Sequence, residues 1–425
     1  MKRVVLCLFL VLTFRTFQFF PLFTYVQEAY FAFGLGILIF ALFHRRHETR
    51  IAESPFVRYL TVLVVLAPLW SAVAAMMEYG QPIVYGLLSL RGVGLLAGSV
   101  GLLYMARFRM VSVKDVEQSF VFLAWATFAL YVAMRVLLTP AEYVDYGKGF
   151  IENRGADGYR FNFSQTFIIV GMIYYFLKAF RRRRPSLYLP AVVLFAFLLG
   201  DAGGRTLTIS TLVTLGFFYA RWSNAWRLVR VTALAAVVVG ASVAVGSVVN
   251  HEATIGRLEQ FRDAFLVVLS GAEVDDPSAN ARALQSVTAL PLVEKNFWVG
   301  NGNVSYQWSD GSVAGLLGEY FYPADIGLLG VVYLYGALGT VLFAIQYIFA
   351  VKEARRSSSQ RHQAFKDCVN GFLLFTGISS IVTGYFCHFP EVVCTMIICL
   401  MLANSPARPR QLRRNRIDAM PSLHP

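Results

Sequence analysis

The sequence predicts an all-α membrane protein with about twelve transmembrane helices and one long external loop, and three observations support this prediction. Of the 425 residues, 57% are apolar and only 15% are charged, and the mean hydropathy is +0.56. A soluble domain has about 45–50% apolar and about 25% charged residues, so this chain cannot bury its apolar surface within itself. The apolar residues also form runs of about 20, long enough to cross a bilayer, and the basic residues gather between alternate runs.

Twelve apolar runs qualify as transmembrane helices when about 20 residues are taken for each crossing. They lie at residues 4–23, 28–43, 57–77, 83–105, 118–138, 164–180, 187–201, 206–220, 230–249, 326–351, 367–387 and 389–404. The first run follows Lys2 and Arg3, as in a signal peptide, but lacks a convincing small-residue cleavage site, so we interpret it as a retained helix. The chain then divides into nine helices over 1–249, an external loop over 250–325, three helices over 326–404 and a basic tail over 405–425.

The long external loop contains helical patterns of its own. Its first apolar positions at helical spacing are Ile255, Leu258, Phe261, Phe265 and Leu269. A second helix is expected to start near Pro277 and to carry Arg282, and residues 298–302 predict a turn. We therefore expect the loop to be helical and packed on the membrane surface rather than folded as a soluble domain.

The distribution of Lys and Arg predicts the orientation of the chain. With the N-terminus in the cytoplasm, 27 of the 38 basic residues fall in segments on the cytoplasmic side, 8 fall outside and 3 lie within spans. This asymmetry follows the positive-inside rule and predicts that both termini are cytoplasmic. The net charge of +13 is then a topology signal that faces anionic lipid, and we expect no nucleic-acid partner.

The sequence contains few signals of familiar catalytic chemistry. The five cysteines lie in apolar segments without paired spacing, which argues against a disulfide framework and against a zinc site. They are Cys7, Cys368, Cys387, Cys394 and Cys399. The chain has no H-E-x-x-H sequence, Walker loop or G-x-S-x-G elbow, and its candidate metal ligands do not cluster. We therefore expect no metal and no other cofactor.

Charges within the spans are the remaining functional candidates, because each costs roughly 2.5–3.5 kcal/mol on insertion scales. Arg15 and Arg91 are each expected roughly 12 Å below the outer surface, while Arg135 is near the outer end of its helix and Arg205 starts the eighth helix. A structural salt bridge would also explain Arg15 or Arg91, and snorkelling would explain Arg135. Because these cations collect in one leaflet, they predict an outward-facing pocket for an anionic group such as a lipid-linked pyrophosphate.

Acidic residues also lie near the outer ends of the predicted spans. They are Glu28, Glu78, Asp201, Glu319, Asp325 and Glu391. Asp201 could simply pair with Arg205 one turn later, and Asp325 could simply cap the tenth helix. Of the six histidines, only His251 and His388 are expected where they could serve an external site.

Three short segments carry a family resemblance. Residues 203–208 (GGRTLT) place an Arg–Thr pair after small residues at the start of a helix, Arg282 precedes the turn at 298–302 (WVGNG), and residues 325–330 (DIGLLG) lead into the next helix. Together with twelve spans and a long loop between helices nine and ten, they resemble the O-antigen polymerase and O-antigen ligase superfamily of bacterial surface-polysaccharide assembly. The ligases carry a His shortly before the last glycine motif, where this chain has residues 318–324 (GEYFYPA), so the resemblance is closer to the polymerases.

The resemblance implies an enzyme of the bacterial inner membrane that polymerises polyprenyl-diphosphate-linked oligosaccharide repeat units into O-antigen, capsule or exopolysaccharide at the outer face. In the implied mechanism Arg205 and Arg282 bind the pyrophosphate, helped by Arg91 and Arg15, and stabilise charge on the leaving group. The candidate proton acceptors are Glu319, His251 and Asp325, and the candidate sugar-stacking residues are Trp298, Tyr306, Trp308, Tyr320 and Tyr322. The implied partners are the lipid-linked glycan and membrane lipid, with a chain-length regulator and a flippase of the same pathway.

Two alternatives remain beside the polymerase. A ligase would transfer the finished glycan to an acceptor. A flippase or transporter of the same lipid-linked glycan would perform no bond chemistry, and it would be expected to show inverted repeats and helices broken near the bilayer midplane. The sequence shows no such repeat.

Overall fold

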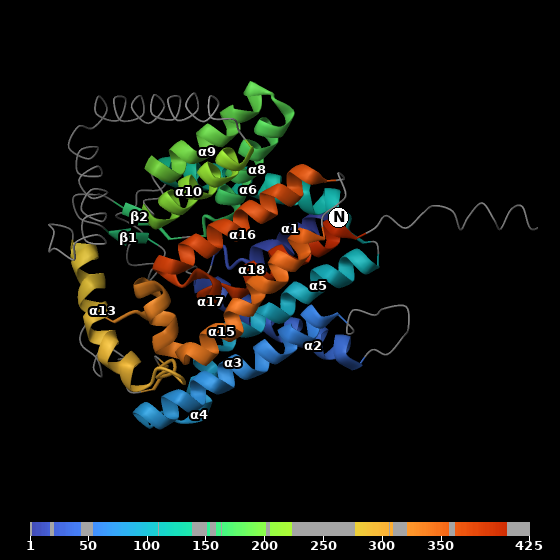
Figure 1. Ribbon diagram of the computed structural model, residues 1–425. Helices are drawn as coiled ribbons and strands as arrows, with labels where there is room; N and C mark the ends of the chain where they lie inside the picture. The colour runs from blue at the N-terminus through green and yellow to red at the C-terminus, as the bar shows by residue number, and fades with distance from the viewer. Residues whose placement is uncertain are drawn as a thin grey trace, which may run out of the picture.

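The computed structural model describes residues 2–17, 21–43, 54–108, 110–137, 151–153, 159–162, 164–200, 205–222, 277–305, 307–308, 321–356 and 362–405. Over these ranges the chain is helical, as predicted, with one short β-hairpin that the sequence did not predict (Figure 1). Helical segments long and apolar enough to cross a membrane are α3 (Pro55–Tyr79), α6 (Val113–Leu137), η6 with α15 (Pro323–Arg355) and α16 (Gln363–Thr383). These four segments mark a multi-pass membrane protein, and the described residues do not extend the count to twelve.

The other elements are shorter or less apolar. The helices are α1 (Lys2–Thr13), α2 (Pro21–Phe43), α4 (Ile83–Ser89), η2 (Arg91–Gly94), α5 (Leu95–Arg107), α8 (Thr166–Arg182), η4 (Pro185–Leu187), α9 (Tyr188–Gly200), α10 (Arg205–Trp222), α13 (Pro277–Lys295), α17 (Tyr385–His388) and α18 (Pro390–Asn404). Strands β1 (Ile151–Asn153) and β2 (Tyr159–Phe161) pair antiparallel, with Glu152 opposite Arg160. The predicted helix at 230–249 lies outside the described residues. The predicted helix near Pro277 is confirmed as α13.

The first predicted span, 4–23, is two helices rather than one. Helix α1 ends at Thr13, and α2 starts at Pro21. A proline is tolerated in the first turn of a helix, where its missing N–H has no intrahelical partner, but it disrupts a helix interior. Arg15, between the two helices, has a left-handed backbone with φ 47°. Pro21 was therefore the signal in the sequence for a break inside this run.

Two further predicted spans are interrupted. The span at 83–105 consists of α4, the 3₁₀ turn η2 and α5, so Arg91 lies at the break. The span at 367–387 ends as α16 at Thr383, and α17 follows after Gly384, whose φ of 58° suits a residue without a Cβ. Both predicted spans thus contain the expected apolar residues but not one continuous helix.

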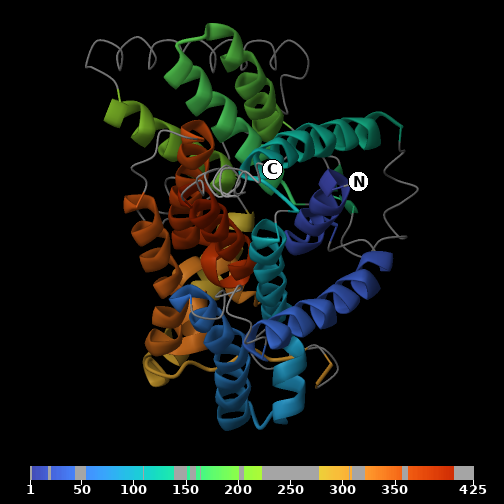
Figure 2. The ribbon, with the colours of Figure 1, turned by 90° about the vertical axis from the view of Figure 1, so that its right-hand side faces the viewer.

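Helix α18 lies at the centre of the bundle. Its residues from Pro390 to Leu400 are all buried, as expected for a helix that is apolar on every side. It packs against α5, α6, α15 and α16. Figure 2 shows α8 and α9 on one side of this centre and α3 and α4 on the other.

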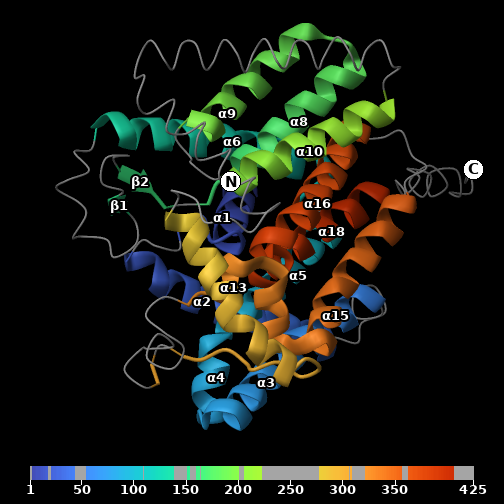
Figure 3. The ribbon, with the colours of Figure 1, turned by 60° about the vertical axis from the view of Figure 1, so that its left-hand side comes forward.

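Contacts between helix ends define two ends of the bundle. At one end, which we call the α13 end, Nζ of Lys295 lies 2.7 Å from Oε1 of Glu78, and the Ser164 N–H donates to the Thr16 carbonyl at 3.1 Å. Helix α13 lies across this end, in front of η6 and the start of α15 (Figure 3).

The opposite end holds a second set of polar contacts. Arg3 pairs with Asp115 at 3.2 Å, Arg181 pairs with Asp367, and Nδ2 of Asn404 donates to the carbonyl of Glu353 at 2.6 Å. The C-terminal ends of α8, α15 and α18 therefore lie together with the N-terminal ends of α1, α6 and α16. This grouping agrees with the alternation of helix directions that the positive-inside count predicts.

Helix α15 is broken where another segment enters the bundle. Gly336, inside α15, has φ 64° and ψ −179°. The backbone groups freed by this break pair with residues 297–302: the N–H of Ala337 donates to the Phe297 carbonyl, and the N–H of Asn301 donates to the Tyr333 carbonyl, both at 2.7 Å. An apolar environment permits non-helical backbone only where such partners exist.

Candidate functional site

Arg15 and Glu391 form an ion pair inside the bundle at the α13 end. The Nε atom of Arg15 lies 2.8 Å from Oε1 of Glu391, and the Glu391 side chain is completely buried, whereas Arg15 keeps 19% of its side-chain surface exposed. Pro390 starts α18, which places Glu391 in the first turn of the helix, where the helix dipole favours an anion. The break after α1 places Arg15 beside this turn.

The residues around this pair come from four parts of the chain. The guanidinium of Arg15 lies over the Phe389 ring, 5.9 Å from its centroid, and interacts electrostatically with His388. Tyr385 of α17 shares a hydrogen bond of 3.1 Å with Thr166 at the start of α8. The site is thus assembled where the end of α1 and the starts of α8 and α18 meet α17.

Several buried polar atoms at this site have no hydrogen-bond partner among the described residues. They are Oε2 of Glu391, Nε2 of His388 and Oγ1 of Thr16. A buried ion pair stabilises a fold only when its remaining hydrogen-bonding capacity is satisfied, so this pair is a poor source of stability. Unpartnered buried polar atoms in a native structure instead indicate a bound water, an ion or a ligand. We therefore take Arg15, Thr16, His388 and Glu391 as the candidate site and call it the Arg15–Glu391 site.

The structure places the four predicted pyrophosphate-binding arginines at the same end or at helix breaks. Arg205 is the first residue of α10. Near the other end of α10, the ring of Tyr219 lies 5.5 Å, centroid to centroid, from the ring of Phe180 near the C-terminal end of α8, so these two helix ends lie side by side. The start of α10 therefore lies at the α13 end. Arg282 is exposed on α13 itself. Arg91 opens η2, and nothing further is described for its side chain or for that of Arg205. The binding role of these residues stays a prediction.

The sequence left two explanations for Arg15, an anion-binding pocket and a structural salt bridge. The structure shows a salt bridge. The partner of Arg15 is Glu391, one of the acidic residues expected near the outer ends of the spans. The exposed side chain of Arg135 in the last turn of α6 agrees with the snorkelling interpretation.

The predicted proton acceptors are only partly described. Glu319 and His251 lie outside the described residues. Asp325 is half-buried in η6, and its N–H donates to the Tyr322 carbonyl at 2.9 Å. Ile326, not Asp325, occupies the N-cap position of α15, and its side chain makes no capping hydrogen bond. The structure thus places Asp325 one residue before the N-cap of α15, because the 3₁₀ turn η6 precedes the helix.

The predicted sugar-stacking residues divide in the same way. Trp298 and Tyr322 are exposed at 64% and 44%, and Trp308 is half-buried. Tyr306 and Tyr320 lie outside the described residues. Trp298 contacts Phe297 edge-on at 5.2 Å, at the C-terminal end of α13. Exposed aromatic rings of this kind suit either a sugar face or the membrane interface.

The two glycines in residues 325–330, one of the segments that resemble the family, are required by the packing of the backbone. Gly327 has φ 59°, and a Cβ there would lie 2.2 Å from the Ile381 carbonyl oxygen, while a Cβ on Gly330 would lie 1.8 Å from the Pro323 carbonyl oxygen. These glycines let η6 fold onto the start of α15. Packing alone accounts for both.

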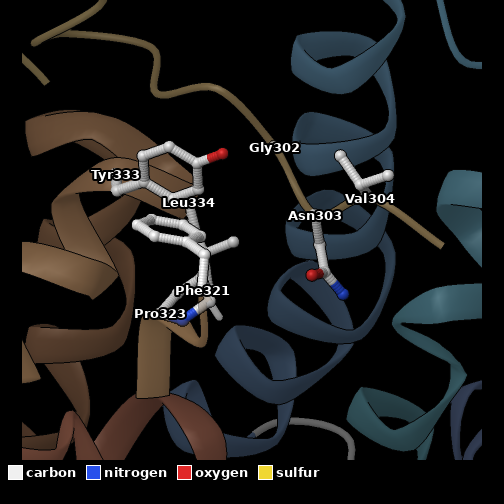
Figure 4. Close-up of a pocket in the computed structure, with 7 residues that line it drawn as sticks. All are labelled: Gly302, Asn303, Val304, Phe321, Pro323, Tyr333 and Leu334. Atoms are coloured by element: carbon white, nitrogen blue, oxygen red, sulfur yellow. The ribbon is translucent and has the colours of Figure 1, made fainter. Parts of the chain in front are cut away.

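A small cavity of about 30 Å³ lies beside this turn. It is lined by Gly302, Asn303, Val304, Phe321, Pro323, Tyr333 and Leu334. Figure 4 shows the rings of Phe321 and Tyr333 on one side of it and Asn303 and Val304 on the other. The cavity has room for water rather than for a sugar ring.

Sequence reasoning identified Arg15, His388 and Glu391 separately but did not pair them, and it missed Thr16. The available signal was that Glu391 is the one charged residue in the final apolar run at 389–404, since a charge in such a run needs a partner.

Over the described ranges, no three His, Cys, Asp or Glu side chains are grouped closely enough to hold a metal ion. All five cysteines are free thiols. No protein-family model, no curated protein and no solved structure matches this chain.

Proposed function

We propose that this chain is a membrane glycosyltransferase that polymerises polyprenyl-diphosphate-linked oligosaccharide repeat units at the outer face of the bacterial inner membrane. The observation that carries the proposal is that cations from distant parts of the sequence lie at the same end of the bundle. Arg15 lies in the bundle at this end, Arg205 starts α10 there, and Arg282 is exposed on α13. A diphosphate presented from one leaflet requires such an arrangement.

The reaction needs charge stabilisation more than covalent chemistry by the protein. A hydroxyl of the acceptor unit attacks the anomeric carbon of the donor and forms the new glycosidic bond. The bond from that carbon to the diphosphate oxygen breaks, and its electron pair stays on the diphosphate. Arg205 and Arg282 stabilise this developing negative charge. The hydroxyl proton passes to a base, for which Glu319, His251 and Asp325 are the candidates.

The proposal includes an orientation. The α13 end faces outward, and both termini and the basic segments at 44–56, 181–186 and 352–366 face the cytoplasm. It is supported by the asymmetry in Lys and Arg and by the grouping of helix ends described above. The donor lipid then reaches the cations from the outer leaflet.

A transporter of the same lipid-linked glycan is the second candidate, and one observation favours it. The spans are interrupted at η2, at Gly336 and between α16 and α17. Discontinuous helices of this kind often form the binding sites of transporters. A ligase remains the alternative within the same enzyme class.

Glycan chain length in a strain without the gene tests the proposal and separates the three functions. Loss of a polymerase leaves single repeat units on the final acceptor, whereas loss of a ligase leaves long unattached glycan. Loss of a transporter leaves repeat units on their lipid at the cytoplasmic face. Polymer of normal length on the acceptor in the deletion strain would remove the polymerase from consideration. Complementation by the unaltered chain is the control.

A further inference from the structure

We propose that the Arg15–Glu391 site binds a diphosphate and a proton together: the diphosphate contacts Arg15, and the proton is taken up by Glu391. The proposal rests on the proposed function for the identity of the ligand, a polyprenyl diphosphate. It assigns Glu391 as a positioning and proton-storing residue that acts through Arg15.

The geometry orders the groups from the surface inward. Arg15 keeps 19% of its side-chain surface exposed, while Glu391 has none, so a ligand that reaches this site meets Arg15 before Glu391. Beside Arg15, the buried hydroxyl of Thr16 has no hydrogen-bond partner among the described residues. A guanidinium and a hydroxyl are both donors that suit phosphate oxygens.

The burial of Glu391 links the two ligands. With Glu391 ionised, the pair with Arg15 is neutral overall. A diphosphate that engages Arg15 leaves the carboxylate without its counter-charge inside the bundle, and an uncompensated buried charge is costly. Uptake of a proton by Glu391 removes this cost. By reciprocity, a proton on Glu391 strengthens diphosphate binding by the same factor.

The linkage matches the chemistry of glycosyl transfer. The reaction breaks the bond between the anomeric carbon and the diphosphate, so negative charge accumulates on the diphosphate, and it releases the proton of the attacking hydroxyl. The free diphosphate carries more negative charge than the sugar-linked form and therefore engages Arg15 more strongly. The released proton, passed on through solvent or the catalytic base, balances the carboxylate of Glu391.

Glu391 interacts with titratable groups from three parts of the chain. These groups are Arg15 beyond α1, Tyr385 of α17 and Cys394 of α18 itself, and His388 faces the same Arg15.

The helices that pack on α18 carry further titratable groups. They are Tyr104 of α5, Glu117 of α6, Tyr335 and Tyr347 of α15, and Lys366 and Asp367 of α16. Tyr335 and Tyr347 interact with Cys387 and Phe386 of α17. Glu117 and Asp367 contact the opposite end of the bundle, near His362 and Arg181.

Calorimetric binding of farnesyl diphosphate to the purified full-length chain in lipid nanodiscs tests the linkage. Titrations in buffers of different ionisation enthalpy report the number of protons taken up per ligand. We expect about one proton per diphosphate above neutral pH, with a dissociation constant that rises about tenfold for each pH unit. Absence of proton uptake by the wild-type chain on binding would overturn the proposal without any variant.

Variants then assign the proton to Glu391. Glu391→Gln mimics the protonated carboxyl, so this variant should bind the diphosphate with no pH dependence and take up no proton, apart from any exchanged by the diphosphate itself. Glu78→Gln is the matched control, because Glu78 is a carboxylate paired with one lysine at the same end, and it should behave as the wild type. The double variant Arg15→Met with Glu391→Met should fold but bind at least tenfold more weakly. Equal proton uptake by the wild type and Glu391→Gln would refute the assignment.

The same measurements separate this inference from the proposed function. If the chain shows proton-linked diphosphate binding but the deletion strain makes polymer of normal length, the linked site stands and the polymerase does not. If polymer depends on the chain but binding takes up no proton, the polymerase stands and the linked site is refuted.

Discussion

Gly300 and Gly336 meet backbone to backbone inside the bundle. A Cβ on Gly300 would lie 2.4 Å from the backbone nitrogen of Gly336, and a Cβ on Gly336 would lie 2.3 Å from the Trp298 carbonyl oxygen. Both residues have positive φ values, 80° and 64°. This contact allows the segment after α13 to enter the bundle and to pair with the broken part of α15, so it joins that segment to the long apolar helices.

The first prediction concerns this contact. Gly300→Ala should lower the free energy of unfolding by about 2–5 kcal/mol, because the new Cβ meets backbone that cannot move aside and the left-handed conformation becomes strained. The apparent melting temperature of the purified protein in detergent measures the effect. Gly216→Ala in α10 is the control, since a Cβ there meets open space and alanine favours a helix by about 0.5–1 kcal/mol. Equal stability of the two variants would contradict the role of the contact.

The second prediction concerns the buried ion pair. Arg15→Met and Glu391→Met should each destabilise the protein by about 3–5 kcal/mol, because each leaves one buried charge uncompensated. The double variant should recover most of this loss, since replacing a buried pair by apolar residues of similar volume is often neutral. Melting temperatures of the four proteins form a double-mutant cycle. Additive losses would show that the two side chains do not depend on each other.

The third prediction concerns Arg205 and Arg282. Arg→Ala at either position should abolish polymer while the amount of protein in the membrane stays normal, because the leaving diphosphate loses its stabilising charge. Arg→Lys should rescue only partly, since a point charge cannot reproduce the bidentate guanidinium fork. Arg135→Ala, at an exposed site in α6, is the control and should leave polymer unchanged. Full activity of both alanine variants would remove the electrostatic core of the mechanism.

The fourth prediction concerns the catalytic base. Glu319→Gln keeps size and polarity but cannot accept a proton at neutral pH, so it should lower turnover more than substrate binding. Asp325→Asn should be mild, because Asp325 lies in the 3₁₀ turn that leads into α15, where asparagine serves as well as aspartate. A ladder assay with purified enzyme and a lipid-linked repeat unit compares them. Normal polymerisation by Glu319→Gln, with an inactive Asp325→Asn or His251→Ala, would mean that the base is wrongly assigned.

The fifth prediction concerns orientation. A single cysteine at position 282 of a cysteine-free chain should react with a membrane-impermeant reagent in intact spheroplasts, and one at position 357 should not. The expectation follows from the basic bias of the segments and from the placement of Arg282 on α13. Labelling at position 357 after lysis is the control that shows this cysteine can react. The reverse pattern would invert the proposed orientation and remove the outer-leaflet site.

Composition and local sequence pattern are enough to predict the class of this protein. Apolar runs must be shielded from water, so composition and run length predict a multi-pass helical protein, and the described long apolar helices agree. The sequence also predicted a helix that starts near Pro277, and α13 starts there. These features depend on residues close together in the chain, where pattern and structure are directly linked.

The positions of the helix breaks and the pairing of the buried charges depend on contacts between distant segments. The break at Gly336 depends on residues 297–302, which pair with the freed backbone groups of α15. The pairing of Arg15 with Glu391 joins the first and the last described helices. A sequence pattern records that a buried charge needs a partner, but the identity of that partner depends on how distant helices pack.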